Sequence, residues 1–216
     1  MFSNLADNKL PEGKHDERDY LVSLLPTELK KIRTRIRSYE RALKKEYDKY
    51  GDYDDSYGKR YLLGALYMLV GDTDGALKHY AWFEKNFADD TGDPLDLLTW
   101  TLTLYRAGDP DAALKKLHQT MLSNLYLIPH LLKMEQQELG ISYLSNLETM
   151  EYLDYMPQEI VKLWDEAALG WLQMHYHAAE TQSLRERYIE IARQLKHEPV
   201  GEKRSKLVRE AFALRG

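Results

Sequence analysis

Apolar residues recur at helical spacing over most of the chain. Between residues 27 and 50 they follow one another at steps of three and four, which places them in one stripe of an amphipathic helix. The stripe consists of Leu29, Ile32, Ile36, Tyr39, Leu43, Tyr47 and Tyr50. An exposed stripe of this size is unfavourable in water, so we expect a helix over residues 26–50 that packs this stripe on the rest of the protein.

The segment 57–125 contains further apolar stretches separated by residues that start and stop helices. Gly71 and Gly108 follow apolar stretches and are expected to take the left-handed conformation that ends a helix. Asp93-Pro94 and Asp109-Pro110 each place a capping residue before a proline, the combination typical of a helix start. Because the long periodic segments have the period of a helix and not of a strand, the sequence predicts an all-α fold. The expected helices here are 57–70, 74–87, 94–107 and one that begins at Pro110.

One sequence phrase occurs twice in this segment. The first copy runs from Gly71 to Lys78 (GDTDGALK) and the second from Gly108 to Lys115 (GDPDAALK), 37 residues later. Each copy follows an apolar helical stretch and precedes an amphipathic one. A fixed period of this size predicts stacked helical hairpins, an architecture typical of binding proteins.

The two units resemble tetratricopeptide repeats (TPRs), which are helix–turn–helix motifs of about 34 residues. In the first unit, six residues match the family pattern: Leu63, Gly64, Tyr67, Gly71, Ala76 and Tyr80. In the second, Gly108 and Ala113 match, whereas Trp100 and Thr101 replace the expected leucine and glycine. The resemblance implies a right-handed α–α superhelix in which the first helix of each hairpin lines a concave groove.

By this resemblance, the groove would hold an apolar or amphipathic peptide or helix. The peptide-binding residues would be Tyr61, Ala65, Met68, Leu98, Leu102 and Tyr105. The lysines and asparagines with which chaperone-binding members of the family hold a carboxylate are missing from these positions, which disfavours a chaperone cofactor. Another interpretation is that the segment after Pro157 folds back and buries the same side chains.

The rest of the chain predicts less regular helices. Pro129 is expected to open a helix to about residue 139, and Pro157 a long helix to about 179. With residues 183–196, the latter would form a divergent third helical pair, and Lys203–Leu214 a final basic helix. Residues 126–216 would thus form a C-terminal helical extension in one domain with residues 26–125. Residues 1–25 show no regular apolar period over most of their length and are expected to form a mobile arm.

Charge is distributed unevenly along the 216 residues, whose formal net charge is −5. Residues 27–50 carry nine Lys or Arg against four Asp or Glu, whereas residues 51–182 carry nine against twenty-one. Residues 183–216 are again basic. The basic ends could contact the acidic middle of the same chain or of a second copy, or they could contact nucleic acid. Acidic residues interrupt the basic face of the first helix, which favours a solvated face over a nucleic-acid site.

Two residue clusters contain side chains that can bind metal ions. His175 and His177 project roughly 200° apart on a helix, so they and Glu180 do not predict a metal site. Acidic residues near position 90 lack the spacing of a calcium loop and are expected to be helix caps and solvated charges. These residues are Asp89, Asp90, Asp93 and Asp96.

No catalytic motif stands out, so the sequence favours a non-enzymatic protein–protein interaction module without cofactor or metal. Its partner would be a protein, a peptide or a second copy forming a homodimer. A regulatory protein that contacts nucleic acid through its basic terminal helices is the alternative, although nucleic acid is the less favoured partner. The absence of cysteine and of a long apolar run is expected for a cytoplasmic protein that makes no membrane contact.

Overall fold

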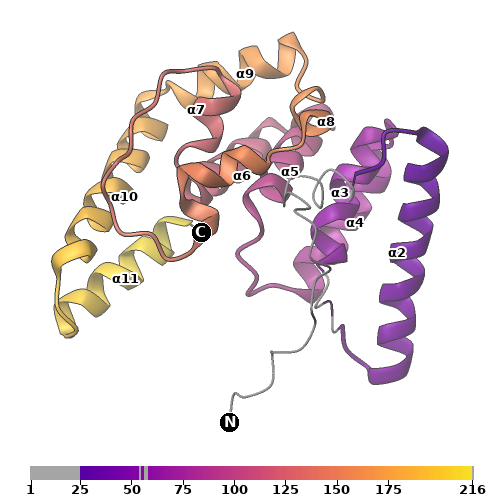
Figure 1. Ribbon diagram of the computed structural model, residues 1–216, viewed down its shortest axis with the longest axis horizontal. Coiled ribbons are helices and arrows are strands. Elements are labelled where there is room, and N and C mark those ends of the chain that lie inside the picture. The colour runs from indigo at the N-terminus through magenta and orange to yellow at the C-terminus, as the bar shows by residue number, and fades with distance from the viewer. Residues whose placement is uncertain (1–24, 54, 56–57, 216) are drawn as a thin grey trace, which may run out of the picture.

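The computed structural model describes residues 25–53, 55 and 58–215, and this part of the chain contains helices and no strand. The all-α prediction is therefore confirmed there, while the predicted arm, apart from Leu25, lies outside the described residues. Figure 1 shows the arrangement of the elements. They are α2 (Leu29–Tyr50), α3 (Lys59–Leu69), α4 (Thr73–Asn86), α5 (Pro94–Arg106), α6 (Pro110–Ser123), α7 (Leu127–Leu131), η1 (Asn146–Glu148), η2 (Met150–Tyr155), α8 (Gln158–Val161), α9 (Glu166–Tyr176), α10 (Ala179–His197) and α11 (Glu202–Arg215).

The long helix α2 packs along α3 at one edge of the molecule (Figure 1). Ile32, Ile36 and Leu43, in the middle of its apolar stripe, are buried in the core. The ends of the stripe differ from the expectation, since Leu29, Tyr47 and Tyr50 are exposed. The middle of the stripe therefore attaches α2 to the first hairpin, and its ends extend beyond that contact.

Helices α3 to α6 form two consecutive hairpins, α3–α4 and α5–α6, and α5 also packs against α3 and α4. The turns have the predicted chemistry: Gly71 and Gly108 have φ values of 75° and 78°, in the left-handed region. At Gly64 the helices approach so closely that a Cβ atom would overlap the ring and hydroxyl of Tyr80. A side chain at position 64 would therefore separate α3 from α4.

An aspartate caps the second helix of each hairpin. Asp72 Oδ1 accepts a hydrogen bond from the Gly75 N–H at 2.8 Å, and Asp109 Oδ1 one from the Ala112 N–H at 3.0 Å. Each bond satisfies an N–H group that has no partner within its own helix. The repeated phrase thus encodes the same turn twice.

The prediction of a helix from Pro129 to residue 139 is wrong. Pro129 lies inside the short helix α7, and the chain leaves helical geometry at Lys133, whose φ is 56°. The following segment, residues 134–145, runs without helix alongside α10 (Figure 1). It is attached there by the Ser142 N–H, which donates to the Ala192 carbonyl oxygen at 3.2 Å.

The long helix expected from Pro157 is also interrupted. Helix α8 ends at Val161, and α9 begins only at Glu166. The break has two causes: Trp164 is inserted into the core, and Asp165 accepts a hydrogen bond from the Ala168 N–H at 2.9 Å, so it starts a new helix. The predicted second helix and the final basic helix are present as α10 and α11.

Candidate functional site

The six side chains predicted to line a peptide groove lie in or beside the protein core. Ala65 and Met68 are 2% exposed, and Leu98 and Leu102 are fully buried. Tyr61 and Tyr105 are partly buried and pack against the core. In this structure a partner therefore has access to little of the predicted groove.

The C-terminal half of the chain packs over the face made by α3 and α5. Helix α8 contacts α3. Trp171 of α9 packs against Tyr105 with ring centroids 5.1 Å apart, and the Tyr152 hydroxyl donates to Asp93 Oδ1 at 2.8 Å. Thus residues 150–176 provide apolar and polar contacts where the resemblance implied an open groove.

An open cleft of about 510 Å³ lies on another face, between the α4–α5 corner and α11. Figure 1 shows α11 ending in the middle of the molecule, across from the loop that joins α4 to α5. The cleft brings together segments that are distant in sequence. Its lining includes Phe83, Glu84, Phe87, Asp89, Asp90, Gly92, Leu97, Trp100, Lys116, Gln119, Ser145, Leu147, Glu148, Phe212 and Arg215.

Aromatic rings form the floor and one side of this cleft. Trp100 is stacked on Tyr80 with ring centroids 4.4 Å apart, and Phe83 meets the same indole edge-on. Across the cleft, Phe212 of α11 is 50% exposed. Phe83 and Trp100 are themselves only 2% and 5% exposed, so it is Phe212 that offers an exposed ring to an apolar side chain of a partner.

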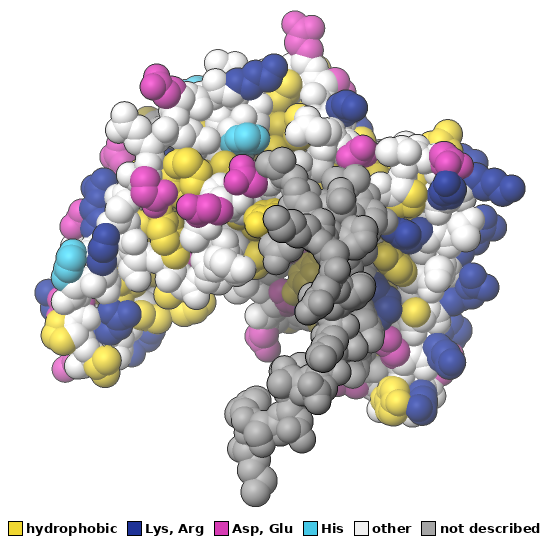
Figure 2. Space-filling view, in the orientation of Figure 1, with side chains coloured by type: hydrophobic (Ala, Val, Ile, Leu, Met, Phe, Trp, Pro, Cys, Tyr) yellow, Lys and Arg dark blue, Asp and Glu magenta, His cyan; other side chains and the backbone are white. Residues whose placement is uncertain are grey.

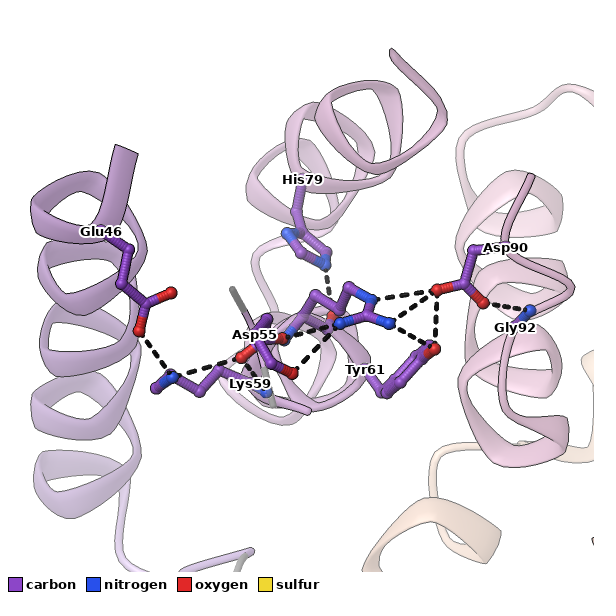
Figure 3. Close-up of polar contacts among 8 residues, drawn as sticks. Glu46, Asp55, Lys59, Tyr61, His79, Asp90 and Gly92 are labelled. Carbon is purple, nitrogen blue, oxygen red and sulfur yellow. Dashed lines mark hydrogen bonds and ion pairs between the residues drawn. The ribbon is translucent and has the colours of Figure 1, made fainter. Parts of the chain in front are cut away.

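The loop that forms one wall of the cleft is held in place by Asp90 (Figure 3). Arg60 donates to Asp90 Oδ2 through Nε and Nη2 at 3.1 and 2.8 Å, and the Tyr61 hydroxyl donates to the same oxygen at 2.7 Å. The Gly92 N–H donates to Oδ1 at 2.9 Å. Burial opposes the charge on this carboxylate, but the hydrogen bonds from Tyr61, Gly92 and Arg60 outweigh burial and lower the pKa of Asp90.

The same network continues to the N-terminus of α3. Asp55 accepts hydrogen bonds from the backbone N–H groups of Lys59 and Arg60 at 2.9 and 2.7 Å, and it is 6% exposed. Lys59 Nζ lies between Asp55 and Glu46 of α2 (Figure 3). Asp55 therefore satisfies the first two N–H groups of α3 and is buried, because its partners surround it.

His79 adds a titratable group to this network. Its Nε2 lies 2.8 Å from the carbonyl oxygen of Arg60, and the ring is 6% exposed (Figure 3). Burial lowers the pKa of His79 to about 4, even though the hydrogen bond to Arg60 and the charge of Asp55 act to raise it. The imidazole is therefore neutral at pH 7 and donates from Nε2 to the carbonyl group.

This buried histidine makes a prediction for the pH dependence of stability. The unfolded chain binds a proton at His79 below about pH 6.5, whereas the folded protein does not until about pH 4, so stability falls as the pH falls through this window. Between these pH values, the free energy of unfolding of a His79→Gln variant should change less steeply with pH than that of the wild type, by up to about 1.4 kcal/mol per pH unit. Urea unfolding at several pH values measures this slope. His197→Gln, at an exposed position, is the control and should keep the wild-type slope.

The wall opposite Asp90 is fixed by Arg215. Its Nη2 lies 2.7 Å from Glu148 Oε1 and also donates to the Tyr188 hydroxyl. At the floor, Lys116 Nζ lies 3.5 Å from the centroid of the Trp100 ring, and burial lowers the pKa of Lys116. Both walls are thus attached to the body of the protein by ion pairs.

The charges at the entrance of the cleft are acidic. Glu84 and Asp89 are exposed, and Glu84 Oε1 is 3.9 Å from Lys116 Nζ, a distance that gives only a weak ion pair. Lys116 and Arg215 are themselves shielded by Trp100 and Glu148. The accessible rim should therefore favour basic groups on a ligand.

Of the acidic residues expected to be caps or solvated charges, Asp93 fits the prediction and Asp96 does not. Asp93 caps α5 as predicted, through the Leu95 N–H at 2.9 Å, and burial raises its pKa. Asp96 does not fit the prediction: it is 2% exposed and accepts a hydrogen bond from the Tyr80 hydroxyl at 3.2 Å. Burial, reinforced by the neighbouring Asp93, raises the pKa of Asp96 well above its usual range.

The described residues contain no group of three or more His, Asp or Glu side chains that could hold a metal ion. His175 packs against Trp171, and His177 packs edge-on against Tyr176, so the two rings have separate surroundings.

In the same described ranges, no helix has the length and apolar character needed to cross a membrane. No family model, curated protein or solved structure matches the chain.

The residues that line the open cleft cannot be identified from the sequence. Trp100 belongs to the repeat pattern, and Phe212 lies in the final basic helix. No local signal distinguishes Phe212, which lies between Ala211 and Ala213. Tertiary packing of α11 against α10 and α6 brings Phe212 to the same cleft as Trp100 and Phe87.

Proposed function

We propose that the protein is a non-enzymatic interaction module whose cleft, between the α4–α5 corner and α11, binds an apolar or amphipathic segment of another protein or of a second copy. The proposal rests on an open cleft of about 510 Å³ in which Phe212 is half exposed, beside the buried rings of Phe83 and Trp100. Its size is that of a site for one or two anchoring side chains. The acidic rim favours anchors flanked by Lys or Arg.

We further infer that α3–α6 are two repeats of the tetratricopeptide type. The support is local: Gly64 packs under Tyr80, the turns at Gly71 and Gly108 are left-handed, and α5 packs on both helices of the first hairpin. The binding surface proposed here differs from the concave face that the resemblance implied. It uses the corner between the two hairpins and a helix from outside them.

A peptide selection with the full-length protein tests the proposed function. A displayed library of random peptides should yield sequences with an aromatic or leucine anchor and basic flanks. Phe212→Ser should weaken the binding of the selected peptides at least tenfold, because it removes the exposed ring from the cleft. Met174→Ser is the matched control, since Met174 is 61% exposed on α9 and does not line the cleft.

Binding of these peptides should be measured by fluorescence anisotropy for each variant. Charge reversal at the rim, by Glu84→Lys combined with Asp89→Lys, should lower the affinity for peptides with basic flanks. It should leave the affinity for peptides with neutral flanks unchanged. If no peptide family is enriched, or if Phe212→Ser and Met174→Ser have equal effects on affinity, the cleft is not the binding site.

A further inference from the structure

The outer face of α2 carries a concentrated positive charge. Ile32, Ile36 and Leu43 direct the opposite face to the core, so the solvent-facing side is defined by the structure. Figure 2 shows Lys and Arg side chains along this edge of the molecule. The exposed cations of this face are Lys30, Arg33, Arg37, Arg41, Lys44 and Lys45.

Two of the acidic residues that interrupt this helix contact α3: Glu46 pairs with Lys59, and Glu40 accepts a hydrogen bond from the Tyr67 hydroxyl. Lys44 lies 3.2 Å from Asp48. The other five cations have no ion pair within the part of the chain that the structure describes. Arg37 and Arg41 each donate Nε to a backbone carbonyl oxygen four residues earlier, at 3.2 and 3.0 Å, which orders their stems along the helix without cancelling their charge.

The second basic helix, α11, differs in this respect. Lys203 pairs with Glu198 at 2.6 Å, and Lys206 pairs with Glu202 at 3.0 Å. Arg215 pairs with Glu148. The positive charge of α11 is therefore largely neutralised within the protein, whereas that of α2 is available to a partner.

We propose that the outer face of α2 binds the phosphate backbone of a nucleic acid. From Lys30 to Lys45 the helix rises about 22 Å, which matches roughly six nucleotides of one strand. Three of the cations are arginines, whose guanidinium groups hold phosphate oxygens with two hydrogen bonds. Because the protein as a whole has a net charge of −5, a nucleic acid would be attracted to this face and not to the whole surface.

The composition of the face favours nucleic acid over an anionic membrane. Helices that lie in a membrane surface insert an apolar side, but the apolar side of α2 is packed on α3. Its exposed apolar residues, Leu29, Tyr47 and Tyr50, lie at the ends of the helix and form no continuous stripe. This surface is separate from the peptide cleft, so the proposal is independent of the proposed function.

The test is the anisotropy of a labelled DNA or RNA duplex of about 20 base pairs, titrated with the full-length protein between 50 and 200 mM salt. If the five cations without an ion pair in the described residues each neutralise a phosphate, the logarithm of affinity should fall with the logarithm of salt with a slope of about −4.5. Arg33→Gln, Arg37→Gln and Arg41→Gln combined should weaken binding at least tenfold at 50 mM salt. They should also make the slope shallower by about three.

The control triple variant is Lys203→Gln, Lys206→Gln and Arg209→Gln in α11, which changes the net charge by the same amount at exposed positions. It should keep wild-type affinity and slope. Three results would overturn the proposal: no salt-dependent binding of either duplex, equal weakening by the two triple variants, or binding to phosphatidylserine vesicles without binding to a duplex.

Discussion

A Leu98→Glu variant is expected not to fold, because the side chain it replaces is fully buried in α5. A carboxylate at this position would have no cation to pair with in the surrounding core of leucine and aromatic residues, and an unpaired buried charge costs several kcal/mol. The expected result is loss of the cooperative unfolding transition and of the near-ultraviolet circular dichroism spectrum. Met174→Glu, on the exposed side of α9, should leave both unchanged.

The same experiment shows whether Leu98 lies in the core or lines an open groove. If Leu98 lined a groove open to solvent, Leu98→Glu would fold normally and would change only the binding of a partner. Tyr105→Glu should be intermediate, because this ring is partly buried and packs against Trp171. A folded Leu98→Glu protein with wild-type stability would show that the C-terminal half does not cover α5 in solution.

Replacing Asp55 by alanine is expected to lower the free energy of unfolding by about 3 kcal/mol. The carboxylate is buried, and it accepts bonds from two backbone N–H groups at the start of α3 as well as from Lys59 and Arg60. Its removal leaves these donors without their acceptor in a place that water reaches poorly. This loss of stability is at the lower end of the range for a broken buried ion pair, because Lys59 keeps its ion pair with Glu46 and Arg60 keeps its ion pair with Asp90.

Urea unfolding followed by circular dichroism measures this difference. Asp89→Ala, in the exposed part of the α4–α5 loop, is the control and should stay within about 0.5 kcal/mol of the wild type. An Asp55→Ala protein as stable as the control would mean that the network of Figure 3 contributes little to the attachment of α2 and the cleft wall to α3.

The helices of the two hairpins could be predicted because their ends are encoded locally. Asp109 needs only the next few residues to cap α6, and Gly108 needs only its own freedom of φ to end the preceding turn. The interruption at Asp165 could not be predicted in the same way. Proline at 157 and a long apolar period predict one helix, and the break depends on the burial of Trp164 as well as on the cap at Asp165.

The candidate site was harder to predict than the fold. Met68 and Leu102 would be apolar whether they faced a bound peptide or the protein's own C-terminal half, so the sequence gives the same pattern in both cases. The contact that covers this face joins Tyr105 to Trp171, residues from distant parts of the chain. The open cleft likewise depends on α11 approaching α6, a contact that no local pattern encodes.

We propose that the face of α3 and α5 is closed in solution and that the cleft beside α11 is open, and thiol labelling can test this claim. The chain has no cysteine, so a single introduced thiol can be followed without background. In the native protein, the Phe212→Cys variant should react with a maleimide almost as fast as a free thiol, and a selected peptide should protect it. The Met68→Cys variant should react only as fast as the protein unfolds; labelling of Met68→Cys at the rate of Phe212→Cys would contradict the claim.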